Sequence, residues 1–208
     1  SEGGKEELQM IERIGRVCYK SEDKITEDGE SAKKFVRMLI NAHHEAMIEH
    51  STLSVMFTVD RGVSHEMVRH RIASFAQEST RYVNYSKDKY GSEINVIDLA
   101  PGIALDRRMQ DMPAETIEAI LNEWEQAMLD AEKHYMKMIE LGATAQIARS
   151  VLPNSTKTNI TITANYREWR NYFRLRTASD AHPQIREVSV ALLNELKERI
   201  PVIFDDIA

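Results

Sequence analysis

The sequence predicts an α+β fold in which helices dominate and surround a central, mostly antiparallel sheet. Apolar residues recur at helical spacing in several stretches, whereas alternation of apolar and polar residues marks only a few short strands. Regular crossover helices do not separate these strands, which argues against a parallel sheet. The chain has no Gly/Ser-rich or Pro-rich linker and no repeat, so we expect one domain over residues 1–208, with residues 1–4 as a cloning remnant.

The first third of the chain is predicted to hold three helices and one strand. Lys5–Tyr19 carries apolar residues at helical spacing, and a second helix is expected to start after Ser31 and run toward His44. Residues 53–59 alternate as a strand does. Ser64 is expected to cap a third helix, which would carry the RHR triplet.

Longer helices are predicted in the remainder of the chain. Pro113 is expected to open a long helix that runs to about Leu141 and is stopped by Gly142. The other expected elements are an extended stretch over residues 82–99, a strand over residues 157–163 and helices over residues 165–176 and 183–200.

Composition limits the possible functions. The net charge is −6 and the isoelectric point is about 5.7, which argues against general nucleic-acid binding, because that binding depends on a wide basic face. No apolar run reaches the roughly 18 residues of a membrane span, so we expect no membrane association. The single cysteine, Cys18, excludes an intramolecular disulfide and fits a reducing compartment, so we expect a cytoplasmic location. Its apolar helical context predicts a small buried residue and not a nucleophile.

The segment Arg69–Tyr82 (RHRIASFAQESTRY) carries the strongest functional signal. A bare RHR triplet is typical of a solvated basic helix end. Here, however, seven residues separate Arg71 from Ser79, and Arg81 follows, so hydroxyl and guanidinium donors recur beyond the triplet. Such donors suit phosphate and carboxylate oxygens, and in an acidic chain they favour a small anionic ligand.

A second basic cluster lies in residues 165–176 (NYREWRNYFRLR). Its aromatic residues are expected to pack, while Arg167, Arg170 and Arg174 share a solvated face. Spacing does not decide whether Arg149 points into a site.

Other site types find little support in the sequence. His44 and His50 lack the HExxH spacing and a nearby third ligand, so no metal is predicted. The glycines form no GxGxxG, GxxxxGK[ST] or GxSxG pattern, so we expect no Rossmann turn, P-loop or nucleophile elbow.

The pattern of RHR, seven residues and then Ser resembles the signature of the flavin-dependent thymidylate synthases. RVCYKS, HHEAMIEHS, SHEMVRHR, ARSVLP and TANYREWRNYFRLR with AHPQIRE resemble further blocks of this family in the family's order. The resemblance implies conversion of dUMP to dTMP, with 5,10-methylenetetrahydrofolate as carbon donor and NADPH-reduced FAD as hydride source. It also implies no enzyme nucleophile and a homotetramer with active sites between subunits. All these ligands are anionic, as a cationic pocket requires.

The resemblance also assigns site residues. Arg176 is implied as the catalytic residue, which stabilises negative charge at N3 of the pyrimidine. The implied dUMP contacts are Glu66, Arg69, Gln77, Glu78, Ser79, Arg81, Arg149 and Arg176. The implied FAD contacts are His44, Arg69, His70, Arg71, Gln77, Asn165, Arg167, Asn171 and His182.

Two alternatives to a synthase stay open, the first of them because of departures from the family pattern. Ala76 and Gln77 stand where many relatives have Asn-Glu, Ala46 stands where a hydroxyl often contacts FAD, and the TASDAH segment before Pro183 is longer than in some relatives. One alternative is therefore a catalytically impaired homologue that binds FAD and dUMP. The other is a single-stranded nucleic-acid binder that uses arginines and aromatic residues such as Trp169, although the acidic composition counts against it.

Overall fold

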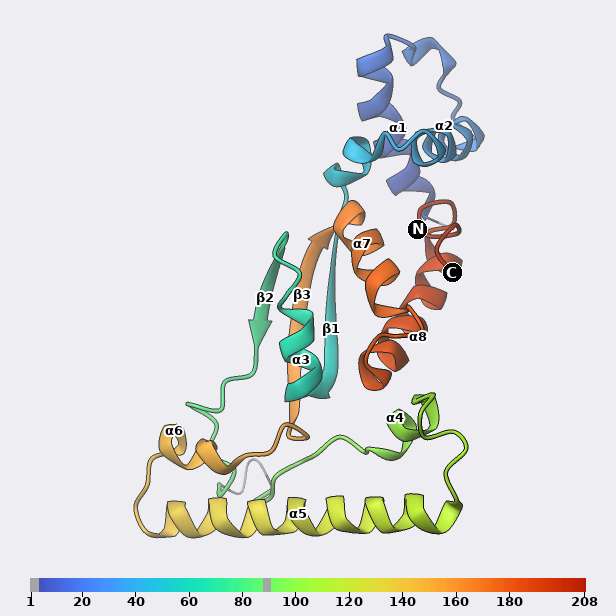
Figure 1. Cartoon of the computed structure of the whole chain (residues 1–208). Coiled ribbons are helices and arrows are strands. Elements are labelled where there is room, and N and C mark those ends of the chain that lie inside the picture. The colour runs from blue at the N-terminus through green and yellow to red at the C-terminus, as the bar shows by residue number, and fades with distance from the viewer. Residues whose placement is uncertain (1–3, 88–90) are drawn as a thin grey trace.

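A three-stranded antiparallel sheet lies at the centre of the computed structural model, which describes residues 4–87 and 91–208 (Figure 1). The elements in chain order are α1 (Lys5–Tyr19), η2 (Glu22–Lys24), α2 (Glu30–Asn41), η3 (Glu45–His50), β1 (Thr52–Asp60), α3 (Arg61–Met67), β2 (Ala73–Gln77), α4 (Ala100–Leu105), α5 (Ala114–Glu140), α6 (Ala145–Ala148), η5 (Arg149–Val151), β3 (Lys157–Asn165), α7 (Tyr166–Arg176) and α8 (Pro183–Arg199). Helices predominate, so the predicted α+β class with an antiparallel sheet is confirmed. The predicted cloning remnant falls largely on residues 1–3, which lie outside the described residues.

The last strand in sequence, β3, occupies the middle of the sheet. It pairs antiparallel with β1 on one side and with β2 on the other. Phe57 of β1 lies opposite Ile160 of β3. Every second residue of β3 is buried, including Ile160 and Ile162, as expected for a strand with one face on the core. Both strands that alternation predicted, over residues 53–59 and 157–163, are confirmed.

The main core lies between the sheet and the helices α7 and α8 (Figure 1). Trp169, Tyr172 and Phe173 of α7 are buried, and the ring centroids of Phe57 and Trp169 lie 6.3 Å apart. The C-terminal segment returns to this core and buries Phe204, whose ring centroid lies 5.6 Å from that of Phe173. The two predicted C-terminal helices are confirmed, each within one residue of the expected bounds.

Helices α1 and α2 pack together at one end of the molecule, close to the C-terminal segment (Figure 1). Leu8 and Ile11 of α1 are buried and belong to the main core. A glycine permits the close approach, because a Cβ atom at Gly15 would lie 2.5 Å from Cε1 of Phe35. Cys18 is exposed, so its predicted burial is wrong. The buried stripe of α1 ends at Gly15, and the last turn of the helix lies beyond it.

The long helix α5 crosses the opposite end of the molecule (Figure 1). Its start after Pro113 and its end before Gly142 are as predicted, and Gly142 has a φ of 95°, a conformation that favours glycine. Among its described residues, Tyr135 alone is buried. Tyr135 packs with Tyr85 and Ala148 in a second, smaller core. None of the described helices is both long and apolar enough to cross a membrane.

The segment around the RHR triplet differs from its prediction. The N-cap of α3 is Asp60, whose carboxylate accepts a hydrogen bond from the backbone N–H of Val63 at 2.6 Å. Ser64 therefore lies inside the helix, and its predicted capping role is wrong. The helix ends at Met67, so the RHR triplet follows it and leads into β2, a strand that the sequence did not predict.

The segment between β2 and α5 is also more irregular than expected. The described part of residues 82–99 forms turns and one isolated bridge, Val96 to Thr156, so the prediction of an extended stretch is wrong for most of it. The short helix α4 follows and was not predicted. Residues 88–90 lie outside the described part.

Candidate active site

Arg176, at the C-terminal end of α7, is held by three hydrogen bonds. Its Nε donates to Nε2 of His70 at 3.0 Å. One terminal nitrogen donates to a carboxylate oxygen of Glu66 at 2.9 Å, and the other donates to the backbone carbonyl of Glu66 at 2.9 Å. A guanidinium has five N–H donors, so these bonds leave two for a ligand. The structure thus brings Glu66, His70 and Arg176 into one network.

His70 is buried at the centre of this network. Its Nδ1 lies 3.0 Å from a carboxylate oxygen of Glu168, and its ring centroid lies 4.9 Å from that of Tyr172. Burial lowers the pKa of His70; the hydrogen bond that Glu168 accepts from the imidazole raises it, the positive charge of Arg176 lowers it, and the net shift is downward. The imidazole is therefore neutral at neutral pH.

Glu168 was not among the predicted site residues, although it is 7% exposed and belongs to the same network. Asn171 donates to both of its carboxylate oxygens at 3.3 Å. Asn165 caps α7 by accepting from the backbone N–H of Glu168 at 2.9 Å. A signal was present in the sequence, because residues three apart on a helix share a face and Glu168 is three residues from both asparagines.

A cavity of about 520 Å³ adjoins the network through Glu168. It is lined by residues of η3 and α7, by the residue before β2 and by the last residue of β3, namely Glu45, Glu49, Ile72, Asn165, Arg167, Glu168, Asn171 and Arg174. Arg167 donates to Glu49 at 2.5 Å, and this bond raises the pKa of Arg167. The volume is that of a small-molecule site, and its guanidinium and amide groups can donate to phosphate oxygens. The lining also holds the carboxylates of Glu45, Glu49 and Glu168, so an anionic dinucleotide such as FAD would fit only if it displaced Glu45 and Glu49 from the half-exposed Arg167 and Arg174.

Arg170 lies on the same helix but is fully buried, so its predicted solvated position is wrong. It donates to both carboxylate oxygens of Asp206, at 2.6 and 2.7 Å, and to the backbone carbonyl of Ile203. Its second terminal nitrogen also lies 3.5 Å from Glu45. The C-terminal segment supplies the carboxylate that makes burial of this charge possible.

The predicted phosphate-binding residues form a turn after β2. The Oγ of Ser79 accepts from the backbone N–H of Arg81 at 3.3 Å, and the carbonyl of Ser79 accepts from two further backbone N–H groups. Glu78 lies 3.9 Å from Lys157. The side chain of Gln77 is engaged inside the chain, since its Nε2 donates to the Oγ of Ser64 at 2.8 Å.

A family model described as "Thymidylate synthase complementing protein" matches residues 4–202. The chain belongs to this family. The flavin-dependent thymidylate synthase of Corynebacterium aurimucosum is 33% identical over 211 residues, which cover 99% of this chain and 82% of that protein. The enzyme of the same description from Mycobacteroides abscessus is 31% identical, over 95% of this chain and 78% of its own length. The family predicted from the motifs is therefore confirmed.

A solved structure supports the fold. The crystal structure of a UMP/dUMP methylase PolB from Streptomyces cacaoi, bound with 5-Br dUMP, superposes with a TM-score of 0.76 at 24% identity. The match covers 95% of this chain and 88% of that one. At 24% identity, this match shows that the two chains share a fold.

Several residues that the family resemblance assigned to the site lie apart in the single chain. His44, whose Nδ1 is 2.8 Å from the hydroxyl of Tyr19, lies at the α1–α2 end, whereas Arg149 lies beside α6 at the other (Figure 1). His182 precedes α8 and lines a cavity of about 400 Å³ with Arg107 and Arg108. Within the described ranges, no hydrogen bond or ion pair joins His44, Arg149 or His182 to Arg176.

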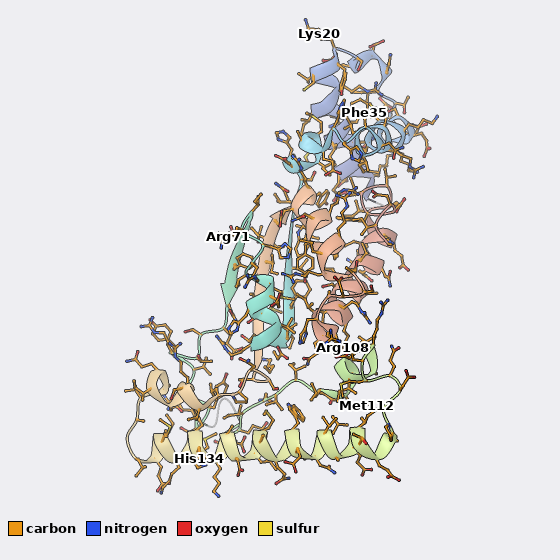
Figure 2. All side chains as sticks on the ribbon, viewed as in Figure 1. Lys20, Phe35, Arg71, Arg108, Met112 and His134 are labelled. Carbon is orange, nitrogen blue, oxygen red and sulfur yellow. The ribbon has the colours of Figure 1, made fainter. Side chains whose placement is uncertain are left out.

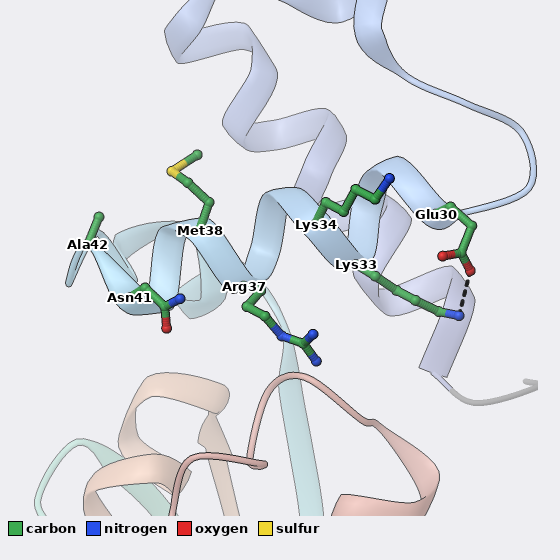
Figure 3. Close-up of a pocket in the computed structure, with 7 residues that line it drawn as sticks. All are labelled: Glu30, Lys33, Lys34, Arg37, Met38, Asn41 and Ala42. Carbon is green, nitrogen blue, oxygen red and sulfur yellow. Dashed lines mark hydrogen bonds and ion pairs between the residues drawn. The ribbon is translucent and has the colours of Figure 1, made fainter.

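Two predicted residues of the RHR triplet point outward. Arg69 and Arg71 are both exposed, and Figure 2 shows Arg71 beside the start of β2. A different basic cavity, of about 680 Å³, lies over α2 (Figure 3). Its Lys33 is paired with Glu30 at 2.7 Å, and none of the predicted site residues lines it. No cluster of three or more potential metal ligands occurs in the part of the chain that the structure describes.

Proposed function

We propose that this protein is a flavin-dependent thymidylate synthase, which methylates dUMP to dTMP with 5,10-methylenetetrahydrofolate as carbon donor and NADPH as reductant. Family membership and relatives of that description, about one third identical over almost the whole chain, support the reaction class and a flavin cofactor. The arrangement of Arg176 carries the proposal, because it is the feature best suited to activate a pyrimidine.

In this proposal the two remaining N–H donors of Arg176 bind the uracil ring of dUMP. Negative charge that develops on the ring is stabilised by the fixed guanidinium, an effect worth about 3–4 kcal/mol where one such donor has been removed from enzyme sites. Glu66 and His70 hold the guanidinium in place before the substrate arrives. The turn of Ser79 and Arg81 binds the phosphate group.

The cavity beside Glu168 is the proposed FAD site. Asn165, Arg167 and Asn171 line this cavity and would bind the cofactor there, and the exposed arginines Arg69 and Arg71, which do not line it, would reach the cofactor from outside. When bound, the flavin supplies the hydride for the reductive methylation. The protein's contribution is to place the ligands, to exclude water and to neutralise their charges.

Tritium release from 5-tritiated dUMP tests the function directly. Release is expected to require FAD, NADPH and methylenetetrahydrofolate together. Arg176→Ala is expected to lower the rate about 100- to 1000-fold, because the guanidinium stabilises transition-state charge. Arg199→Ala, at an exposed ion pair on α8, is the matched control and should retain the wild-type rate.

Two outcomes would contradict the proposal. If FAD and dUMP bind but no label is released under any of these conditions, the chain is the impaired binding homologue. If Arg176→Ala turns over as fast as Arg199→Ala, the role of Arg176 is wrong even though the activity stands.

A further inference from the structure

Glu168 is a buried carboxylate for which the proposed reaction has no use. It lies on the first half of α7, and Arg176 ends the same helix. Between them lies His70, which contributes one ring nitrogen to each: Nδ1 to Glu168 at 3.0 Å and Nε2 to Arg176 at 3.0 Å. The three side chains therefore form a continuous hydrogen-bonded row.

The chemistry of this row fixes the direction of each hydrogen bond. The Nε of an arginine carries a proton and can only donate, so Nε2 of His70 must accept. The proton of the neutral imidazole is then on Nδ1, where it is donated to the Glu168 carboxylate, which only accepts. In the opposite tautomer, two N–H groups would face each other at Arg176, and Nδ1 would face a carboxylate without a proton to share.

We propose that Glu168 is a positioning residue for Arg176. By binding the Nδ1–H of His70 it selects the tautomer that accepts from Arg176, and the guanidinium is thereby kept in the orientation that leaves its other donors for the pyrimidine. This inference rests on the proposed function, in which Arg176 contacts dUMP.

The charges around His70 make this role depend on pH. Glu168 and Arg176 of α7 and Glu66 of α3 are the charged groups that face the ring, and the ring of Tyr172 packs beside it. Protonation of His70 would put a second positive charge against Arg176 and a donor in front of its Nε. Both carboxylates favour that protonation, so loss of the Glu168 charge makes His70 harder to protonate.

Two substitutions separate positioning from a merely structural role. Glu168→Gln keeps the size and one oxygen that can accept from Nδ1, whereas Glu168→Met has a similar length and no comparable acceptor. We expect Glu168→Met to lower kcat about tenfold with little change in KM for dUMP, since the lost hydrogen bond acts through a group that stabilises the transition state. We expect Glu168→Gln to stay within about threefold of wild type, because the tautomer is retained.

The pH profile of kcat adds a readout that a structural role would not move. The acid limb is expected where His70 protonates, and in Glu168→Gln it should shift to lower pH. Glu195→Gln, at an exposed ion pair on α8, is the matched control and should leave the acid limb in place. An acid limb at the same pH in all three proteins would overturn the inference, as would equal kcat values for the Met and Gln variants.

The tautomer can be observed without any turnover. In the ligand-free protein labelled with 15N-histidine, long-range 1H–15N correlation should show His70 protonated at Nδ1, with His70→Gln used for assignment. In Glu168→Met the signal should move toward the Nε2-protonated form. An Nε2-protonated His70 in the wild type would refute the inference and leave the synthase activity untouched. Conversely, an Nδ1-protonated His70 without tritium release would refute only the proposed function. If Glu168→Met does not fold, the inference is tested by the wild-type histidine spectrum and by the pH profile of kcat of Glu168→Gln.

Discussion

At the scale of single residues, His70 shows how burial and charge act on one titratable group. The imidazole is 6% exposed, and both its surroundings and the adjacent Arg176 disfavour the protonated form. Glu168 raises the pKa of His70, but the net shift of that pKa is still downward. A ring in this position is held neutral, so it can accept a hydrogen bond from an arginine, which an imidazolium cannot do.

This environment predicts a pH dependence of folding stability. The folded-state pKa of His70 is below its ordinary value of 6.5, so between those two pH values the unfolded chain binds more protons. The contribution of neutral His70 to folding stability is therefore complete above pH 6.5. It is lost as the pH falls through the lower, folded-state pKa. Urea denaturation from about pH 8 to 5 should show stability falling with acidification, and less steeply in His70→Gln. The same slope in both proteins would contradict this assignment.

At the scale of secondary structure elements, the arginines of α7 behave in different ways despite their regular spacing. Arg167 and Arg174 are half-exposed at the candidate FAD cavity, whereas Arg170 is fully buried and joins α7 to the C-terminal segment. Its hydrogen bond also lowers the pKa of Asp206. Burial of a guanidinium is acceptable because carboxylate and carbonyl oxygens surround it.

Removal of this buried charge should therefore be costly. Arg170→Met would remove the central partner of Asp206 and Glu45; because Asp206 is 45% exposed and Arg174 lies near both carboxylates, we expect a loss of about 1–3 kcal/mol. Chemical denaturation would measure the change in the free energy of unfolding. Arg199→Met removes an arginine whose side chain is 72% exposed and should change stability by less than about 0.5 kcal/mol. Equal effects of the two substitutions would show that the Arg170 pair contributes no more than a surface pair.

The same elements show how far local sequence patterns reach. Helices α1, α5, α7 and α8 were predictable because apolar periodicity and flanking Pro or Gly residues record what one element does on its own. Strand β2 was not, because Ala73, Ser74 and Ala76 give a weak alternation and its partner β3 lies far along the chain. The cap of α3 was misplaced because both Asp60 and Ser64 have capping side chains, and tertiary context selects the first.

Local sequence patterns also predicted only part of the candidate site. Motifs assigned Glu66, His70 and Arg176 to one site, and the structure joins them by hydrogen bonds. Spacing alone treated Arg170 like its neighbours, since the carboxylate that buries it comes 36 residues later in the sequence. Glu168 was overlooked because its role depends on His70, 98 residues earlier. The spacing on α7 put Glu168 on the face of Asn165 and Asn171, but its contact with His70, like that of Arg170 with Asp206, is set by the fold.

At the scale of the whole molecule, the two cores lie at different places and the assigned site residues are spread between them. The large core holds the network of Arg176, while Arg149 belongs with α5 and the small core (Figure 1). Among the described residues of α5, only Tyr135 is buried, and Leu129 is 52% exposed. These features support the proposal of a homotetramer with sites completed between subunits.

This proposal predicts the mass in solution. Light scattering on a gel-filtration column should give about four times the chain mass of 23.9 kDa. Leu129→Lys places a charge on the exposed side of α5 and should reduce that mass if the helix lies between subunits. Glu140→Gln, at an exposed ion pair at the end of α5, is the control. A monomer with full tritium-release activity would rule out shared sites.

The strand order of the sheet has a consequence for how the chain acquires its structure. Neither β1 nor β2 can pair until β3 is available: Ser54 bonds to Thr163, 109 residues later, and Gln77 bonds to Thr158, 81 residues later. Contacts between residues so far apart in the sequence are slow to form, because loop entropy is lost before strand pairing stabilises the sheet. On the ribosome, the first two strands would emerge with unsatisfied edges, which other chains could join. The strand that completes the sheet thus also ends the period in which the nascent chain is most prone to aggregate.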